Sequence, residues 1–228
     1  MGSSPTRSTK MPISKIKKFN LKFCLPTDKF ILAVSGGPDS QCLLKAFSHV
    51  VGQSFCLAVG VNHGLRPEAD SELDLAAALA EVVGVPFRRI QLNLEPGSNI
   101  QCRARDARYA ALTQVADEFG ARFIVTAHHF DDRAETVLFR LLRGEGVGSL
   151  GVMPPVSGRI YRPLLSVKRE RIMSYLKRWN VPYATDPSNV NRKYLRSKIR
   201  HEILPLLESI NPQIKSRLNS LSDEILKS

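Results

Sequence analysis

From residue 30 onward the chain alternates short apolar runs with longer amphipathic stretches, and this alternation limits the possible folds more than any other feature. The runs typical of buried strands lie at 30–34, 55–61, 87–92, 122–127 and 160–163. The stretches typical of helices follow Pro38 and then lie at 68–83, 98–119, 131–143, 167–179 and 194–210. Strands that alternate with helices form parallel sheets with helices on both faces. We therefore expect one α/β domain of this kind, followed by a short basic helical segment at the C-terminus.

The length and apolar runs of the chain exclude several protein classes. Its 228 residues suffice for one such domain and a small appendage. Every apolar run is shorter than the roughly 18 residues that a membrane span needs. We expect no membrane partner.

The net charge of +12 comes from the two ends of the chain. Residues 1–30 hold seven basic and one acidic side chain, and residues 159–228 hold fifteen basic and six acidic ones. The middle, residues 31–158, holds eleven basic and fourteen acidic side chains. Basic ends around a near-neutral centre are typical of proteins that bind nucleic acid, although solvated lysines and arginines would give the same count.

The cysteines and the N-terminus bear on localisation. Cys24, Cys42, Cys56 and Cys102 form no C-x-x-C pair and no metal-ligand spacing, so we expect reduced thiols. Residues 1–20 contain no acidic residue and five basic ones, which fits an organelle transit peptide, an arm that contacts RNA or a cloning-derived sequence. We expect a cytoplasmic protein, with organellar targeting left open.

A glycine-containing loop follows the first expected strand. Its residues are Ser35, Gly36, Gly37, Pro38, Asp39 and Ser40. Glycines let the backbone approach a ligand closely, and the free N–H groups of the following helix attract an anion. Proline suits the first helical turn, while the Asp and Ser side chains would serve a cation and a phosphate oxygen. The loop lacks the lysine of a Walker A motif and the third glycine of a dinucleotide fingerprint.

A second polar cluster follows the fourth expected strand. His128 and His129 precede Asp131, Asp132 and Glu135. If a helix begins near Asp131, this residue and Glu135 share one helix face, where carboxylates repel unless a cation binds. Either histidine would act as an acid or base near neutral pH. Helix capping and ordinary salt bridges are the alternative for a single aspartate, and the spacing does not favour zinc.

These motifs, with others in the same order, resemble the tRNA(Ile)-lysidine synthetase family of the PP-loop superfamily of N-type ATP pyrophosphatases. The other motifs are HGLR at 63–66, RDARY at 105–109, RLLRG at 140–144, RPLL at 162–165, DPSN at 186–189 and YLRSKIR at 194–200. The resemblance runs from about residue 29 to residue 212. It implies a Rossmann-like sheet of the adenine nucleotide α-hydrolase type.

The resemblance also implies a reaction in two steps. ATP adenylates the C2 oxygen of the wobble cytidine, at position 34, of a tRNA(Ile) with a CAU anticodon. The amine of free L-lysine then attacks C2 and expels AMP, which leaves lysidine. ATP and Mg²⁺ are the cofactors that this reaction requires.

The roles that the resemblance implies divide into three groups. Residues 35–40 and His63 would hold ATP, and Asp39 would also bind Mg²⁺. Asp131, Asp132 and Glu135 would hold the lysine ammonium groups or a second Mg²⁺, and His128 would accept a proton. Arg105 and Arg108 would stabilise the α-phosphate or the adenylated base, unless they form a solvated basic face. The residues implied in tRNA contact are Asn189, Arg196 and Arg200.

These roles give a provisional division of the chain. We expect a basic, flexible arm at 1–28, a PP-loop catalytic domain at 29–166 and a basic helical segment that contacts tRNA at 167–228. Most family members continue beyond the position of Ser228, so we expect either a minimal member or a fragment. A homodimer is left open.

Two alternatives use the same residues differently. A tRNA 2-thiolation enzyme would use the same loop to adenylate a base, but such enzymes depend on paired cysteines, and none is present. A non-catalytic module that binds ATP or RNA would not need the intact carboxylates at Asp39, Asp131, Asp132 and Glu135.

Overall fold

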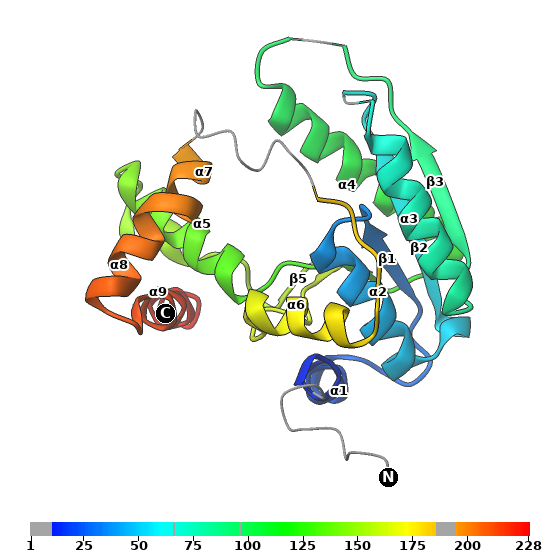
Figure 1. Ribbon diagram of the computed structural model, residues 1–228, viewed down its shortest axis with the longest axis horizontal. Helices are drawn as coiled ribbons and strands as arrows, with labels where there is room; N and C mark the ends of the chain where they lie inside the picture. The colour runs from blue at the N-terminus through cyan, green and yellow to red at the C-terminus, as the bar shows by residue number, and fades with distance from the viewer. Residues whose placement is uncertain (1–10, 66, 96, 186–194) are drawn as a thin grey trace.

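The computed structural model describes residues 11–65, 67–95, 97–185 and 195–228 (Figure 1). One six-stranded sheet forms its centre, in the order β3-β2-β1-β4-β6-β5. The strands are β1 (Phe30–Val34), β2 (Cys56–Asn62), β3 (Phe87–Gln91), β4 (Phe123–Val125), β5 (Val156–Ser157) and β6 (Ile160–Tyr161). All neighbouring pairs are parallel except β5 and β6, which are antiparallel. The predicted parallel α/β fold is confirmed.

Helices cover both faces of this sheet. Phe30, Leu32 and Val34 of β1 belong to a core shared with α2 (Pro38–Val51), α3 (Ala69–Val82) and α6 (Arg169–Arg178). Ile31 of β1 faces the other side, where it joins a second core with α4 (Ile100–Phe119). Because successive strand residues point to opposite faces, a five-residue apolar run such as β1 supplies both cores.

A third apolar cluster builds a helical lobe beside the sheet. Val137 and Leu138 of α5 (Phe130–Leu142) pack with Ile199, Leu204 and Leu218. The other elements of this lobe are η2 (Val147–Leu150), α7 (Leu195–Lys198), the π-helical segment η4 (Ile199–Ile203), α8 (Leu204–Ile210) and α9 (Ile214–Ile225). Figure 1 shows the lobe at the opposite side of α6 from α2 and α3.

Several boundaries differ from those expected. The helix expected at 194–210 is divided into α7, η4 and α8, and α9, β5, η2 and η1 (Gln53–Phe55) were not predicted. The expected basic segment at 167–228 belongs to two different units, because α6 packs on the sheet while α7 to α9 pack on α5. No helix in the described ranges is both long and apolar enough to cross a membrane.

The expectation of a flexible arm at 1–28 is wrong for the part of it that forms a helix in the described residues. Residues Met11–Phe23 form helix α1, and the side chain of Ile16 is fully buried in the core shared with α2 and α6. The helix is nearly balanced between apolar and polar residues, and Ile13 and Ile16, three residues apart, both pack on this core. The N-terminal basic segment therefore contributes to the core through α1.

We predict that Ile16→Ala lowers the free energy of unfolding by about 2–5 kcal/mol, because it leaves a cavity in a packed core. Lys17→Ala, at an exposed position on the same helix, should change it by less than about 0.5 kcal/mol. Urea denaturation measures both. Equal, negligible effects would contradict the docking of α1.

Candidate functional site

The strand order creates a crevice between β1 and β4. After β1 the chain continues to β2 and β3 on one side, and it returns to β4 on the other. Ligands of open α/β sheets bind outside the carboxyl ends of the strands at such a switch point. The glycine loop follows β1 and the histidine pair follows β4, so both predicted motifs lie at this crevice.

Gly36 is the tightest point of the loop. Its φ is +75°, and a Cβ atom built on it would lie 2.0 Å from the backbone oxygen of Glu72 on α3. Its carbonyl also accepts a hydrogen bond of 2.9 Å from the N–H of Ala184. A residue without a side chain is therefore required for the loop to reach both segments.

Hydroxyl groups fix the rest of the loop. The Ser35 N–H donates to Ser40 Oγ at 3.1 Å, and Ser40 Oγ donates to the Gly37 carbonyl at 2.9 Å. Helix α2 begins with Pro38 in its first turn, and within the described ranges no side chain caps its N-terminus. N–H groups without such an acceptor make this helix end a suitable site for an anion.

The fully buried ring of His129 links the motif after β4 to the glycine loop. Its Nδ1 caps α5 by accepting the Asp131 N–H at 3.2 Å. Its Nε2 lies 3.5 Å from Asp39 Oδ1 and 3.5 Å from Asp132 Oδ2. Burial alone would lower the pKa of His129, but these carboxylates outweigh burial and raise it. The ring thus bridges α2 and α5.

The carboxylate of Asp39 is surrounded by cationic and imidazole side chains. Arg169 Nη1 donates to its Oδ2 at 3.0 Å, and its buried Oδ1 has no hydrogen-bond partner among the described residues. Burial would raise the pKa of Asp39, but His129, Arg169 and Arg200 hold it below its ordinary value. His129 Nε2 is the neighbour of Oδ1, at 3.5 Å, and this separation leaves the oxygen able to meet a cation.

The remaining carboxylates are paired with cations of the helical lobe. Arg200 forms a two-pronged ion pair with Glu135, at 2.7 and 2.8 Å, and reaches Asp132 at 3.2 Å. Lys215 Nζ lies 3.0 Å from Asp131 Oδ1. The repulsion expected between the carboxylates of α5 is therefore relieved by the protein itself.

His128 and the arginines of α4 form a less acidic side of the site. His128 Nδ1 and Thr126 Oγ1 share a hydrogen bond of 2.8 Å. Burial is the main reason that the pKa of His128 is lowered to about 4. Asp132 raises this pKa, whereas Arg162, Arg108 and Arg105 lower it. Burial and Arg108 also lower the pKa of His63. Both imidazoles are therefore neutral at pH 7.

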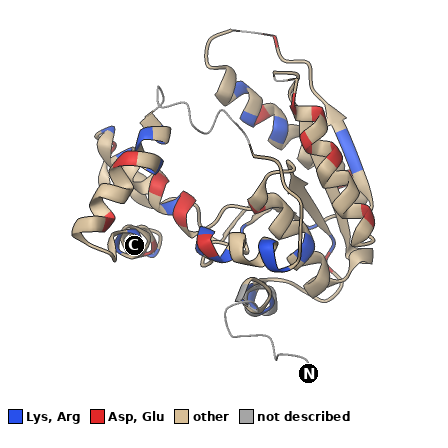
Figure 2. Ribbon diagram, in the orientation of Figure 1, with Lys and Arg blue, Asp and Glu red and all other residues tan. Residues whose placement is uncertain are grey.

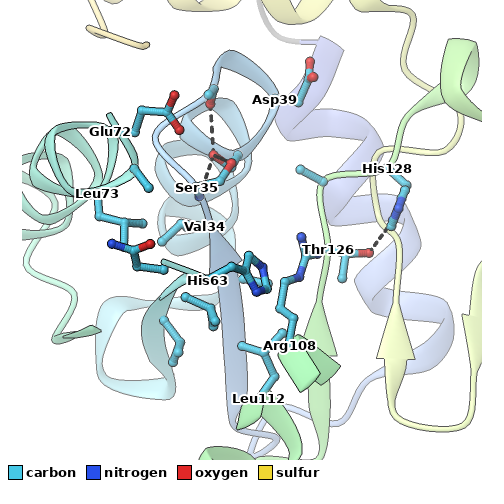
Figure 3. A pocket seen from close by; sticks show the side chains of 18 of the residues that line it. Val34, Ser35, Asp39, His63, Glu72, Leu73, Arg108, Leu112, Thr126 and His128 are labelled. Atoms are coloured by element: carbon cyan, nitrogen blue, oxygen red, sulfur yellow. Dashed lines mark hydrogen bonds between the residues drawn. The ribbon is translucent and has the colours of Figure 1, made fainter. Parts of the chain in front are cut away.

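A pocket of about 420 Å³ joins these elements. Figure 3 shows Ser35 and Asp39 on one side of it, His63 and Arg108 next to each other, and Thr126 with His128. Its apolar walls come from the strand ends and from α3 and α4, at Val34, Val59, Val61, Leu73 and Leu112. The polar rim and the apolar interior suit a nucleotide.

Most predicted site residues meet at this pocket. Those that line it are Ser35, Gly37, Asp39, Ser40, His63, Arg108, His128 and Asp132. Asp131 and Glu135 lie beside it in ion pairs, and the guanidinium of Arg105 lies over the ring of Tyr109, 5.4 Å from its centroid. Arg196 donates to Thr136 Oγ1 at 2.9 Å, and Asn189 lies outside the described residues.

Sequence reasoning missed three residues that organise the site. Arg169 pairs with Asp39, Lys215 pairs with Asp131, and the buried Arg162 adds positive charge near His128. Arg162 lies in the RPLL motif, which was a usable signal. No sequence signal pointed to Arg169 or Lys215, because each contacts a partner that lies far away in the sequence.

A parallel sheet with a glycine loop at its switch point and an uncapped helix N-terminus defines an α/β protein of the nucleotide-binding class. The family model of the PP-loop domain matches residues 9–207, so the chain belongs to the PP-loop domain family. The match begins before α1, which agrees with the packing of that helix on the core.

Known proteins resemble the chain in sequence and in fold. It is 41% identical to a tRNA(Ile)-lysidine synthase of Novosphingobium aromaticivorans, over 77% of this chain and 56% of the relative. It is 37% identical to one of Bacteroides thetaiotaomicron, over 88% of this chain and 48% of the relative. The chain thus spans about half the length of these curated relatives. The matches confirm the resemblance that the motifs indicated.

Among solved structures, the U34-tRNA thiolase NcsA of Methanococcus maripaludis with its [4Fe-4S] cluster has the same fold. The two structures superpose with a TM-score of 0.81 at 18% identity, covering 96% of this chain and 80% of the thiolase. NMN synthetase of Francisella tularensis gives a TM-score of 0.57 at 14% identity, covering 98% of this chain and 94% of that protein. These likenesses concern the fold.

We predict that Gly36→Ala lowers the free energy of unfolding by about 2–4 kcal/mol, since the new methyl group meets the backbone of α3 at a positive φ. Gly37→Ala is the matched control, because its Cβ would meet only Ser35 Oγ, at 3.6 Å. Chemical denaturation of both variants provides the measurement. A Gly36→Ala protein as stable as the Gly37→Ala protein would contradict the close approach.

We also predict an acid sensitivity that depends on His128. Its pKa of about 4 in the folded state lies below the ordinary 6.5, so the unfolded chain binds more protons between these values. The resulting stabilisation is fully present above pH 6.5, and about 2–3 kcal/mol is lost as the pH falls to 4. His128→Asn should lose less stability over this range. Parallel losses in both proteins, measured by denaturation at several pH values, would refute the assignment.

Proposed function

We propose that the chain attaches free L-lysine to C2 of the wobble cytidine of a tRNA(Ile) with a CAU anticodon, at the expense of ATP, with release of pyrophosphate and AMP. The observation that carries this proposal is the pocket in which the glycine loop, His63 and the motif after β4 meet. The 37–41% identity to tRNA(Ile)-lysidine synthases supports the choice of substrates.

The nucleotide end of the pocket suits ATP. The N–H groups at the start of α2 and the backbone of the glycine loop would bind phosphate oxygens. The apolar walls formed by Val59, Val61 and Leu112 would take the adenine ring. Ser40 already donates to Gly37, so its role is to hold the shape of the loop as much as to meet phosphate.

Mg²⁺ fits the donor set at Asp39. Asp39 lines the pocket, and its buried Oδ1 makes no hydrogen bond within the described residues, although His129 Nε2 lies 3.5 Å away. Mg²⁺ is commonly bound by one or two carboxylates together with substrate phosphates. A bound Mg²⁺ would neutralise the charge that develops on the departing pyrophosphate. His129, and after it Arg169 and Arg200, hold the pKa of Asp39 low, and Arg169 also orients the carboxylate through its hydrogen bond.

Adenylation would use the positive side of the pocket. The C2 oxygen of the cytosine attacks the α-phosphorus of ATP, and the bond from that phosphorus to the bridging oxygen breaks as pyrophosphate leaves. Arg108 lines the pocket, with Arg105 one helical turn away on α4, and both would stabilise the phosphate as its charge shifts.

The lysine step would use the acidic side. Asp132 is the carboxylate of α5 that lines the pocket, so it would receive an ammonium group there, although Arg200 also reaches it at 3.2 Å. The ammonium must lose a proton before nitrogen attacks C2 and AMP departs. His128 lines the same pocket as a neutral imidazole, so it can accept that proton.

The cation-rich lobe would receive the anticodon region. Arg196 lies over Phe139 at 5.7 Å and is oriented by Thr136, which leaves a planar guanidinium at the edge of the lobe. We propose that Arg196, with Asn189, contacts the RNA, while Arg200 serves mainly to hold the carboxylates of α5. A tRNA substrate favours a reaction in the cytoplasm.

The thiolation alternative finds less support in the side chains. Cys42 and Cys56 are buried and Cys102 is exposed on α4, and none of the four cysteines lines the pocket. Within the described ranges no group of three or more His, Cys, Asp or Glu side chains is arranged to hold a metal ion. The similarity to the thiolase concerns the fold and carries no transfer of its chemistry.

We predict that the chain incorporates radiolabelled lysine into tRNA(Ile) bearing CAU when ATP and Mg²⁺ are present, and that Asp39→Asn lowers the rate by about 100-fold or more. Filter retention of labelled tRNA measures this. Failure of the wild-type chain to incorporate lysine would refute the proposed reaction.

Asp117→Asn is the matched control for this variant. It removes the same charge from an exposed position on α4, where Asp117 pairs with Arg159 away from the pocket. It should retain the wild-type rate. Circular dichroism of both variants separates lost chemistry from lost folding, and a folded Asp39→Asn protein with full activity would remove Asp39 from the mechanism.

A further inference from the structure

A second pocket lies at the opposite end of α2 from the glycine loop. Its volume is about 330 Å³, and it lies between α1, α2, η1 and α6. The residues that line it are Ile13, Lys45, Ser48, His49, Gln53, Val83, Tyr175 and Trp179. About ten residues of helix, or roughly 15 Å, separate Asp39 from His49 along α2, so this pocket is distinct from the site described above.

The chain's single tryptophan forms one wall of this pocket. Trp179 is 50% exposed, although an indole of this size normally loses most of its surface in a folded protein. Tyr175 packs beside it, with ring centroids 6.3 Å apart, and keeps the indole in place. Lys45 Nζ and the guanidinium of Arg178 lie 5.8 and 6.0 Å from its centroid. An anchored aromatic surface flanked by cations is the arrangement on which nucleic acid bases stack.

The segments around this pocket are basic, and the acidic exception is the exposed Glu81, close to Val83 at the end of α3. The sequence contains no Asp or Glu along α1, from Lys45 to the end of α2, or in α6 after Glu170. Lys15, Lys17 and Lys177 are exposed there. Figure 2 shows α1 and the C-terminal end of α6 side by side, with blue and no red. The excess of basic side chains favours a ligand that is anionic as well as flat.

We propose that this pocket binds an unpaired nucleotide of an RNA strand, with its base stacked on Trp179 and its phosphates met by Lys45 and Arg178. The contact is separate from the lysidine reaction, because it uses no residue of the catalytic pocket. In this proposal, the basic helix α1 and the C-terminal end of α6 form one continuous surface that binds RNA.

The single tryptophan makes a direct test available. The full chain, without ATP, Mg²⁺ or lysine, is titrated with an unstructured oligoribonucleotide at low salt. Trp179 fluorescence and the anisotropy of a dye-labelled copy of the same RNA are followed together. We expect saturable quenching with the Kd that anisotropy reports. RNA binding that leaves the tryptophan emission unchanged would overturn the proposal.

Two further ligands distinguish the sources of the signal. A polyglutamate peptide supplies negative charge without bases, and AMP supplies a base without a strand. We expect neither to quench Trp179 at concentrations where the RNA saturates it. Equal quenching by polyglutamate would assign the surface to acidic peptides, and tighter binding of AMP than of RNA would assign the pocket to a free nucleotide; either result overturns the proposal.

Variants test the stacking itself. Trp179→Leu should weaken RNA binding by about 5-fold or more in the anisotropy assay. Tyr183→Leu is the matched control, because Tyr183 is a partly exposed aromatic residue, 37% accessible, outside this pocket. Lys45→Gln keeps the indole and should weaken both signals together. Wild-type affinity in Trp179→Leu would overturn the stacking role.

Discussion

The fully buried ring of His129 lies between carboxylates of α2 and α5, and those carboxylates also meet cations from the last third of the chain. A buried charge without a partner is far more costly than a buried pair, so each member of this network requires the others. The network therefore fixes the glycine loop, α5, α6 and the helical lobe relative to one another. The members from the last third are Arg169, Arg200 and Lys215.

This network divides the pocket into two electrostatic halves. On one side Asp39 and Asp132 lie close to the ring of His129. On the other side Arg108 and the neutral His63 line the same pocket, with Arg162 nearby. A polyphosphate and a cationic amino acid need opposite fields, and the pocket offers both within one volume. His128 lies where the two fields meet, and its burial, with a smaller effect of the nearby arginines, lowers its pKa so that the ring is neutral.

Local sequence signals were sufficient for the sheet and for most of the pocket. Strand β1 was predicted at its observed bounds, because a short apolar run such as Phe30–Val34, followed by a glycine loop and a helical stretch, is typical of a strand in a covered parallel sheet. Asp39, His63 and His128 were predicted together, since the carboxyl ends of parallel strands meet at one edge.

Long-range packing decided what the sequence left open. Helix α1 is nearly balanced between apolar and polar residues, and only its contact with α2 and α6 gives Ile16 a buried position. The π-helical turn at Ile199–Ile203 interrupts a continuous helical pattern and brings Arg200 onto Glu135. Such pairings depend on how the lobe docks, which no local pattern of charges encodes.

The central part of the proposed function is that the pocket would activate the tRNA base and leave the carboxylate of lysine unreacted. A tRNA(Ile) carrying a heavy oxygen isotope at C2 of its wobble cytidine tests this claim most directly. After reaction with ATP and unlabelled lysine, mass spectrometry of the released AMP should find one heavy oxygen in its phosphate, because the C2 oxygen departs with AMP. Unlabelled AMP formed alongside lysine-modified tRNA would contradict the account.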